Sequence, residues 1–269
     1  MDYPPIPPIL GTIFGGLFGL MIGSFFNVVI YRMPRGESVV WPPSRCMGCG
    51  YQIKFYENVP VIAWLLLRGK CKSCGIALSK QYPIVEAVTG ITAALCAWFF
   101  LTLGDVLPLD FKIGVTFLAL ASIPIFVIDF RHFLIPDLLT YPGILLGLGL
   151  SFIPGGQTPV QSFTGAAAAG GFLWLVGFAA SLVLKKEAMG LGDVKLIAMA
   201  GALFGAPIAL FGLIFASLLG SVVGLPMIFL RKLDEHRHIP FGPYICVGVI
   251  LSAFFGNQVI AWYMLMLGR

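Results

Sequence analysis

The stretch ILGTIFGGLFGLMIGSFFNVVIY, residues 9–31, contains no charged side chain. As a helix it would be about 35 Å long, which is enough to cross about 30 Å of hydrocarbon. It is too long for a cleaved signal peptide, follows a proline-rich start instead of basic residues, and lacks a small-residue cleavage site. The stretch therefore predicts a first membrane-spanning helix.

Seven further apolar runs follow in the chain. They occupy residues 82–103, 111–128, 138–153, 162–184, 194–206, 208–230 and 241–267, and the end of the short run 194–206 is the least defined boundary. The chain is 58% hydrophobic and 11% charged, and a bundle with so little polar surface would aggregate in water. We therefore expect an all-α polytopic membrane protein with about eight transmembrane helices in the lipid bilayer.

Lysine and arginine are distributed unevenly between the connections. Fifteen of the 17 lie on one side, in residues 32–81 and in the turns near 131, 185–195 and 231–237. The other two are Lys112 and Arg269. The positive-inside rule predicts that the basic connections are cytoplasmic and that both termini are external. The net charge of +5 suits anionic lipid, and we take it as no indication of nucleic-acid binding.

Residues 32–81 form the largest polar segment and contain two CxxC pairs. The four cysteines are Cys46, Cys49, Cys71 and Cys74, and a glycine follows each pair, Gly50 and Gly75. Four thiolates at this spacing can close a tetrahedral zinc site in a reducing compartment, with a redox pair or a disulfide staple as the alternative. A complete thiolate shell leaves no open position, so we expect the zinc to be structural.

Small and polar residues mark the first apolar run. Glycines recur every fourth position, which favours close packing against a neighbouring helix over a substrate groove; they are Gly11, Gly15, Gly19 and Gly23. Asn27 is a polar group within the same run, and we expect it to bond a neighbouring helix. Cys96 and Cys246 lie inside apolar runs and are interpreted as small hydrophobic residues.

Two aspartates, Asp129 and Asp193, stand where apolar runs reach the basic side, and Asp193 ends a GxGD sequence. A carboxylate near hydrocarbon is costly unless it is paired or protonated. Two of them held close together could share one proton, as in aspartic proteases. The alternative is that they separately cap helix ends or pair with Arg131 and Lys195. Asp137 follows a proline, and we expect it in the first turn of a helix.

Further segments complete a pattern along the whole chain. They are GSFFNVVIYRMP (residues 23–34), the two CxxC pairs, ENVP (57–60), YPIVE (82–86), Ile128-Asp129, IPD (135–137), GLGDVKL (190–196) and IPFGPY (239–244). Together they resemble a bacterial type IV prepilin peptidase, a prepilin leader peptidase and N-methyltransferase of the GxGD membrane aspartyl proteases. The resemblance implies that Asp129 and Asp193 are the catalytic pair. It also implies a first-loop zinc module.

The same resemblance implies substrates and a methyl donor. Members of the family cut the basic leader from type IV prepilins and type II secretion pseudopilins at the cytoplasmic face of the bacterial inner membrane. Many then methylate the new N-terminus with S-adenosylmethionine, and Gly69 and Glu86 are weak candidates for that activity. Gly69 could equally be a turn glycine, and Glu86 could cap or pair at the second helix. Lys195, Pro240 and Gly242 are expected around the active site.

The resemblance divides the chain into a first transmembrane helix (1–31), a cytoplasmic four-cysteine zinc domain (32–81) and a transmembrane peptidase core (82–269).

Two other classes of function remain open on the residues alone. A proton-coupled transporter would also need membrane carboxylates, and a zinc-anchored scaffold of a secretion machine would need the loop. The GxGD context and the lack of a persuasive internal repeat favour the protease.

Overall fold

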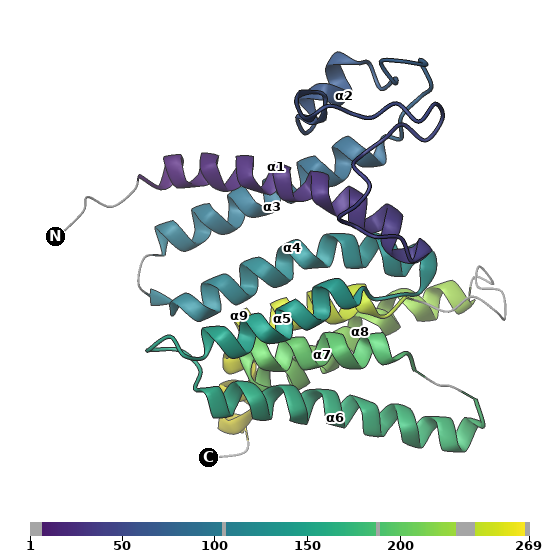
Figure 1. Ribbon diagram of the computed structural model, residues 1–269. Helices are drawn as coiled ribbons and strands as arrows, with labels where there is room; N and C mark the ends of the chain where they lie inside the picture. Colours follow the sequence, from purple (N-terminus) through teal and green to yellow (C-terminus); the bar gives the residue numbers. More distant parts are fainter. Residues whose placement is uncertain (1–6, 104–105, 187–188, 230–239, 267–269) are drawn as a thin grey trace. The chain divides into compact units, whose positions relative to one another are not determined.

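The computed structural model describes residues 7–103, 106–186, 189–229 and 240–266, which are helical apart from loops and two isolated bridges (Figure 1). The helices are α1 (Pro8–Arg32), α2 (Ile62–Leu66), α3 (Gln81–Thr102), α4 (Leu109–His132), α5 (Asp137–Leu150), α6 (Pro159–Leu184), α7 (Leu191–Phe204), α8 (Ala206–Phe229) and α9 (Gly242–Met266), with short 3-10 turns at Met33–Arg35 and Phe55–Asn58. The chain separates into two compact units, Met1–Leu107 and Pro108–Arg269.

Each of the eight predicted apolar runs falls on a helix. Five segments are long and apolar enough to cross a membrane: Pro8–Arg35, Gln81–Thr102, Leu109–His132, Pro159–Leu184 and Ala206–Gly224. The chain is therefore a multi-pass membrane protein. Helices α5 and α7 have 14 residues each, about 21 Å, and that is short for a complete crossing. The number of eight spans stays a prediction.

In the first unit, α1 packs closely along α3 through its glycines. A Cβ atom added at Gly19 would lie 2.5 Å from Ala93 Cβ, and one added at Gly23 would lie 2.7 Å from Glu86 Cα. Contacts this short leave no room for a side chain, so the expected close packing is confirmed. Asn27 donates its Nδ2 hydrogen to the Tyr82 carbonyl of α3 at 3.1 Å, which confirms the expected bond between helices.

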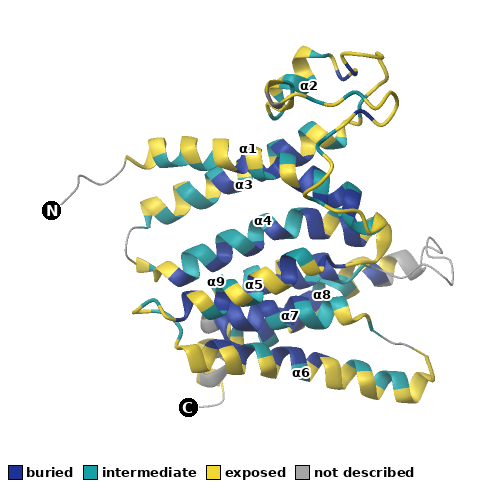
Figure 2. Cartoon of the chain, in the orientation of Figure 1, coloured by how far each residue is buried: buried dark blue, intermediate teal, exposed yellow. Residues whose placement is uncertain are grey.

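In the second unit, α7 is the central helix and contacts α4, α5, α6, α8 and α9. Its residues from Leu196 to Phe204 are almost all buried, and Figure 2 shows this burial in dark blue. Glycines allow the close approach: a Cβ added at Gly147 would lie 2.6 Å from the Ala202 carbonyl carbon. Because α7 is surrounded by protein over most of its length, it holds its first turn in a fixed place.

Helix α7 begins earlier than the apolar run that predicted it. The run was expected at 194–206, whereas the helix extends from Leu191 to Phe204. Gly190 is the residue before the helix, and Gly205, with a φ of 83°, ends it. The first turn contains a polar residue and a glycine, so hydropathy did not include it in the apolar run, although it is helical. Asp193 consequently lies inside the first turn of α7.

Candidate active site and metal centre

Asp129 lies in the last turn of α4, beside the start of α9. Its carboxylate is buried, and Oδ2 accepts a hydrogen bond from the Gly242 amide at 2.9 Å. A Cβ at Gly242 would lie only 2.8 Å from that oxygen, so the contact requires a residue without a side chain. Gly242, which was expected around the active site, is thus in direct contact with Asp129. Pro240 is half-buried, and Ile239 lies outside the described residues.

Ile135 connects Asp129 with the start of α7. It is a buried residue of the loop between α4 and α5, and it faces Gly192 and Gly242: a Cβ at either glycine would lie 3.0 Å from Ile135 side-chain atoms. The ends of α4, α7 and α9 therefore meet around one isoleucine. Asp193 directly follows Gly192 in the first turn of α7. The fold thus brings both aspartates to the same end of the second unit.

Cys246 lies one turn into α9 and is buried. Sequence reasoning interpreted it as a small hydrophobic residue, and its burial fits that interpretation.

Lys195, two residues after Asp193, was considered as a partner for the two aspartates, but it pairs with another carboxylate. Its Nζ lies 2.8 and 2.9 Å from the two carboxylate oxygens of Asp137, the first residue of α5. The ammonium group also lies over the Tyr141 ring, 5.1 Å from its centroid. Lys195 therefore joins α5 to α7 through the Asp137 carboxylate. Asp137 occupies the first turn of a helix as expected, but its ion pair was not foreseen, because the partners are far apart in sequence.

The four cysteines of the first unit come together at one point. The Sγ atoms of Cys46, Cys49, Cys71 and Cys74 all lie within 4.8 Å of one another, and those of Cys46 and Cys74 are 3.8 Å apart. A tetrahedral zinc site with Zn–S bonds of about 2.3 Å has sulfur–sulfur separations of about 3.8 Å. All four thiols are free, so the cluster fits a metal ion better than a disulfide.

The two CxxC turns repeat the same backbone pattern. In the first, the Cys46 amide donates to the Tyr51 carbonyl and the Gly50 amide to the Cys46 carbonyl; in the second, Cys71 donates to Ile76 and Gly75 to Cys71. Gly50 and Gly75 have φ values of 72° and 71°, a region that glycine adopts without strain. A glycine after each CxxC pair therefore permits the backbone geometry of both turns.

The thiols differ in how easily they ionise. Amide hydrogen bonds from Cys49 and Gly48 lower the pKa of Cys46. The Ile76 amide acts in the same direction on Cys74, but desolvation and the three neighbouring thiols outweigh it and raise the pKa of Cys74 to about 11. Four thiolates this close together repel one another unless a cation balances their charge. The arrangement is therefore chemically suited to a divalent soft metal such as zinc.

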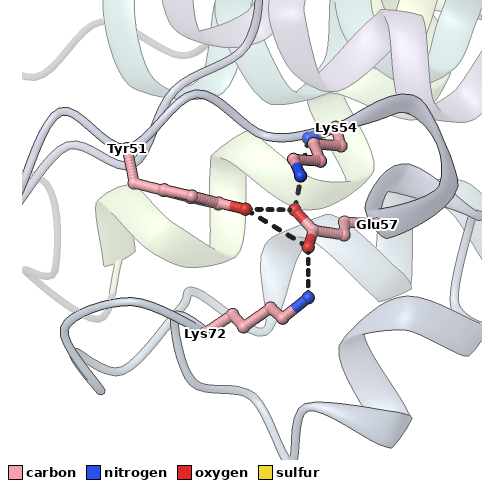
Figure 3. Close-up of polar contacts among 4 residues, drawn as sticks. All are labelled: Tyr51, Lys54, Glu57 and Lys72. Carbon is pink, nitrogen blue, oxygen red and sulfur yellow. Dashed lines mark hydrogen bonds and ion pairs between the residues drawn. The ribbon is translucent and has the colours of Figure 1, made fainter.

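Glu57 ties the two cysteine turns together (Figure 3). Its carboxylate accepts hydrogen bonds from Tyr51 Oη at 3.0 Å, from the Lys54 amide at 3.2 Å and from Lys72 Nζ at 2.6 Å. The Lys72 contact is the main reason that the pKa of Glu57 is lowered. Tyr51 belongs to the first turn and Lys72 to the second, so one carboxylate bridges both. The sequence contained no signal for this role beyond the ENVP segment.

Gly69 and Glu86 both have structural partners. Gly69 has a φ of 66°, and a Cβ there would lie 2.7 Å from Trp64 Cζ2. Glu86 is buried in α3, and its Oε2 accepts a hydrogen bond from the Val61 amide at 2.7 Å. These contacts match the alternatives of a turn glycine and a capping carboxylate. They leave a role for either residue in methylation as a proposal.

Comparisons with known proteins give consistent matches along the chain. Residues 17–100 match the family model described as the bacterial peptidase A24 N-terminal domain, and residues 116–225 match that of the type IV leader peptidase family. The chain is 33% identical to a prepilin leader peptidase/N-methyltransferase of Stutzerimonas stutzeri, with 92% of each chain covered. It is 32% identical to the protein of that name from Pseudomonas aeruginosa, over 98% of this chain and 97% of the relative. No solved structure matches the chain.

Proposed function

The chain belongs to the type IV leader peptidase family, and from this membership we propose that it is a membrane aspartic endopeptidase that removes the leader peptide from prepilins. Relatives that match it over most of its length are named prepilin leader peptidase/N-methyltransferase. We extend the proposal to N-methylation of the new N-terminus, with S-adenosylmethionine as methyl donor. Pseudopilins of type II secretion are the second class of substrate.

The proposed catalytic residues are Asp129 and Asp193. The observation that carries this assignment is the convergence of α4, α7 and α9 around Ile135. Asp129 accepts a hydrogen bond from the Gly242 amide, and Asp193 follows Gly192, which faces Ile135. Two carboxylates in one partly desolvated place share a proton more easily than they both ionise. Asp137 is excluded from the pair in this proposal because Lys195 holds its carboxylate.

The proposed reaction uses the pair as base and acid together. The ionised carboxylate takes a proton from a water molecule, whose oxygen forms a bond with the carbonyl carbon of the scissile peptide. The protonated carboxyl donates a hydrogen bond to the carbonyl oxygen and stabilises the charge that develops there. The resulting diol collapses, the C–N bond breaks, and the leaving nitrogen receives a proton from the pair. The products are a leader with a free carboxylate and a mature chain with a free amine.

The membrane location explains the choice of substrate. We propose that the protein resides in the bacterial inner membrane, with the aspartate pair and the residue 32–81 loop facing the cytoplasm, as the distribution of basic residues predicts. A prepilin would keep its apolar helix in the bilayer and its basic leader in the cytoplasm. Its scissile bond would then lie at the depth of the aspartate pair. The loop segment 231–240, also expected on this side, lies outside the described residues except for Pro240.

Cys46, Cys49, Cys71 and Cys74 would hold the proposed zinc ion. The metal would fix the two turns of the loop in place by occupying all four thiolates, and it would contribute no chemistry to peptide cleavage. Gly69 and Glu86 are retained as weak candidates for a role in methylation. Their partners Trp64 and Val61 both belong to the loop, so either residue could act by shaping it.

A single assay tests the proposed function. The purified protein is incubated with a model prepilin and isotope-labelled S-adenosylmethionine, and the products are identified by mass spectrometry. We expect a free leader peptide and a mature chain that carries the label on its N-terminal nitrogen. An intact prepilin after prolonged incubation with protein that is folded and metal-loaded would refute the peptidase. Cleavage without label would remove methylation alone.

A further inference from the structure

The loop between α1 and α3 contains an uncharged apolar run that the proposed chemistry does not use. Residues 59–67, VPVIAWLLL, include the whole of α2. The run is far too short to cross a bilayer, and apolar segments well below spanning length often lie at a membrane interface. The packing around it decides between burial in a folded loop and contact with lipid.

Two hydrogen bonds hold this run against the sides of α1 and α3. Glu86 of α3 accepts the Val61 amide hydrogen at 2.7 Å. Asn58 Nδ2, just before the run, lies 3.4 Å from Ser24 Oγ of α1. At the same level α1 and α3 are in close contact: a Cβ added at Gly23 would lie 2.7 Å from Glu86 Cα. The start of the run is therefore attached to the helix pair itself.

These attachments lie well below the helix ends. Ser24 precedes the last residue of α1, Arg32, by eight positions, which is about 12 Å along the helix. Serine is short, so Asn58 must approach α1 at that depth. Glu86 lies five residues into α3, about 7 Å from its start. Such a depth corresponds to the boundary between headgroups and acyl chains.

The apolar side chains of α2 point away from the protein. Ile62, Leu65 and Leu66 are 55%, 60% and 78% exposed, and Figure 2 shows exposed residues on α2. Next to the attachment points, Phe25 of α1 and Ile84 of α3 are also exposed. Both belong to candidate membrane spans. Exposed apolar side chains therefore occur both on α2 and near the points where the run is attached to α1 and α3.

We propose that α2 inserts into the membrane interface, with Ile62, Leu65 and Leu66 in contact with lipid acyl chains. Arg68 and Lys70 follow directly and are exposed, so their charges suit anionic headgroups at the same surface. Moving three large apolar side chains from water into lipid is favourable because it removes their apolar surface from water. The loop is then bound to the bilayer through α2. This inference is independent of the catalytic assignment.

Depth-dependent quenching tests the proposal on the full-length protein. A fluorescent non-canonical amino acid replaces Leu66, and the protein is reconstituted in vesicles of phosphatidylethanolamine and phosphatidylglycerol with acyl-chain-brominated lipid. We expect fluorescence at position 66 to be quenched about as strongly as at Ile91, an exposed position of α3. The label at Ser73, an exposed residue of the second cysteine turn, should keep its fluorescence. The bound metal content of each labelled protein shows that the loop remains folded.

Three results would overturn the proposal. Equal fluorescence at positions 66 and 73 would place α2 in water. Protection of position 66 from aqueous iodide without quenching by brominated lipid would mean that protein covers the face. No lipid quenching at position 66, together with a change in its fluorescence on addition of a prepilin peptide, would identify the face as a substrate site instead.

Discussion

At the scale of single residues, Asp129 lies in the last turn of α4 and Asp193 in the first turn of α7. We predict that Asp129→Asn, Asp193→Asn and the double variant each lower the rate of leader cleavage by about 10³-fold or more, to the same floor. The losses should not add, because a shared proton requires both carboxylates. Mass spectrometry of a model prepilin over time measures the rates. Metal content should be unchanged in all three variants.

Asp137→Asn is the matched control for this prediction. It is the same substitution in the same region, but the Asp137 side chain is 51% exposed and pairs with Lys195. Exposed ion pairs contribute at most about 1 kcal/mol, so substantial cleavage should remain. If Asp129→Asn cleaves normally while Asp137→Asn is inactive, the pair has been assigned to the wrong aspartate. If all the variants cleave normally, the protease mechanism fails.

Gly242 provides a second residue-scale prediction, because its amide bonds Asp129. In Gly242→Ala the methyl group would lie 2.8 Å from Asp129 Oδ2 and 3.0 Å from Ile135 Cδ1. One of these groups must move, so we expect the cleavage rate to fall by about 10-fold or more, since misplacement by about 1 Å can cost 10²-fold. Membrane insertion should be retained.

Gly171→Ala in α6 is the control for Gly242→Ala. It adds the same methyl group in a helix, but a Cβ at Gly171 meets nothing within 4 Å. Its cleavage rate should equal that of the wild type. Equal rates for both variants would show that the close approach of Gly242 to Asp129 is not needed for catalysis.

At the scale of elements, the two cysteine turns depend on one another through the four thiols and Glu57. We predict that Cys71→Ser removes most of the bound zinc and loosens the loop, because the second turn loses a ligand and the remaining thiolates lose their counter-charge. Elemental analysis of the purified protein measures the metal. Chelation should impair methylation or stability more than peptide cleavage, since the metal takes no part in that step.

Cys96→Ser is the matched control for the zinc prediction. Cys96 is a half-buried residue of α3 outside the four-thiol cluster. Its variant should keep the full zinc content of the wild type. Undiminished zinc in Cys71→Ser would refute the site.

At the scale of the whole molecule, the uneven distribution of basic residues predicts the orientation in the membrane. Lys186 belongs to a predicted cytoplasmic turn and Val106 to a predicted external one, and both are exposed. A membrane-impermeant maleimide applied to intact cells should label Val106→Cys and leave Lys186→Cys unlabelled, after subtraction of the wild-type background. The reverse pattern would invert the topology.

Part of this architecture follows from local sequence. The apolar runs identify all the long helices because a helix in lipid must be apolar over most of its length. The CxxC pairs and their glycines indicate the four-cysteine cluster because ligand spacing and positive φ values are local properties. The glycine repeat of α1 predicts close packing for the same reason, although the sequence did not identify α3 as its partner.

Other features depend on contacts between distant residues. Hydropathy placed α7 at 194–206 and omitted its polar first turn, and the buried position of α7 among five helices appeared only in the fold. The ion pair of Lys195 with Asp137 and the bridging role of Glu57 each join residues whose separation in sequence carries no signal. The two hydrogen bonds that attach the residue 59–67 run to α1 and α3 also join residues far apart in sequence.

Composition, periodicity and ligand spacing are read along the chain, so they were enough to predict the class of protein, the helices, the four cysteines and the two candidate aspartates. Which groups meet became visible only in the folded chain: Gly242 with Asp129, Ile135 between α7 and α9, and Lys195 with Asp137. Such contacts depend on how whole helices pack. A close approach is permitted at a glycine, but the neighbouring helix that makes it is selected by the fit of all the buried surfaces together.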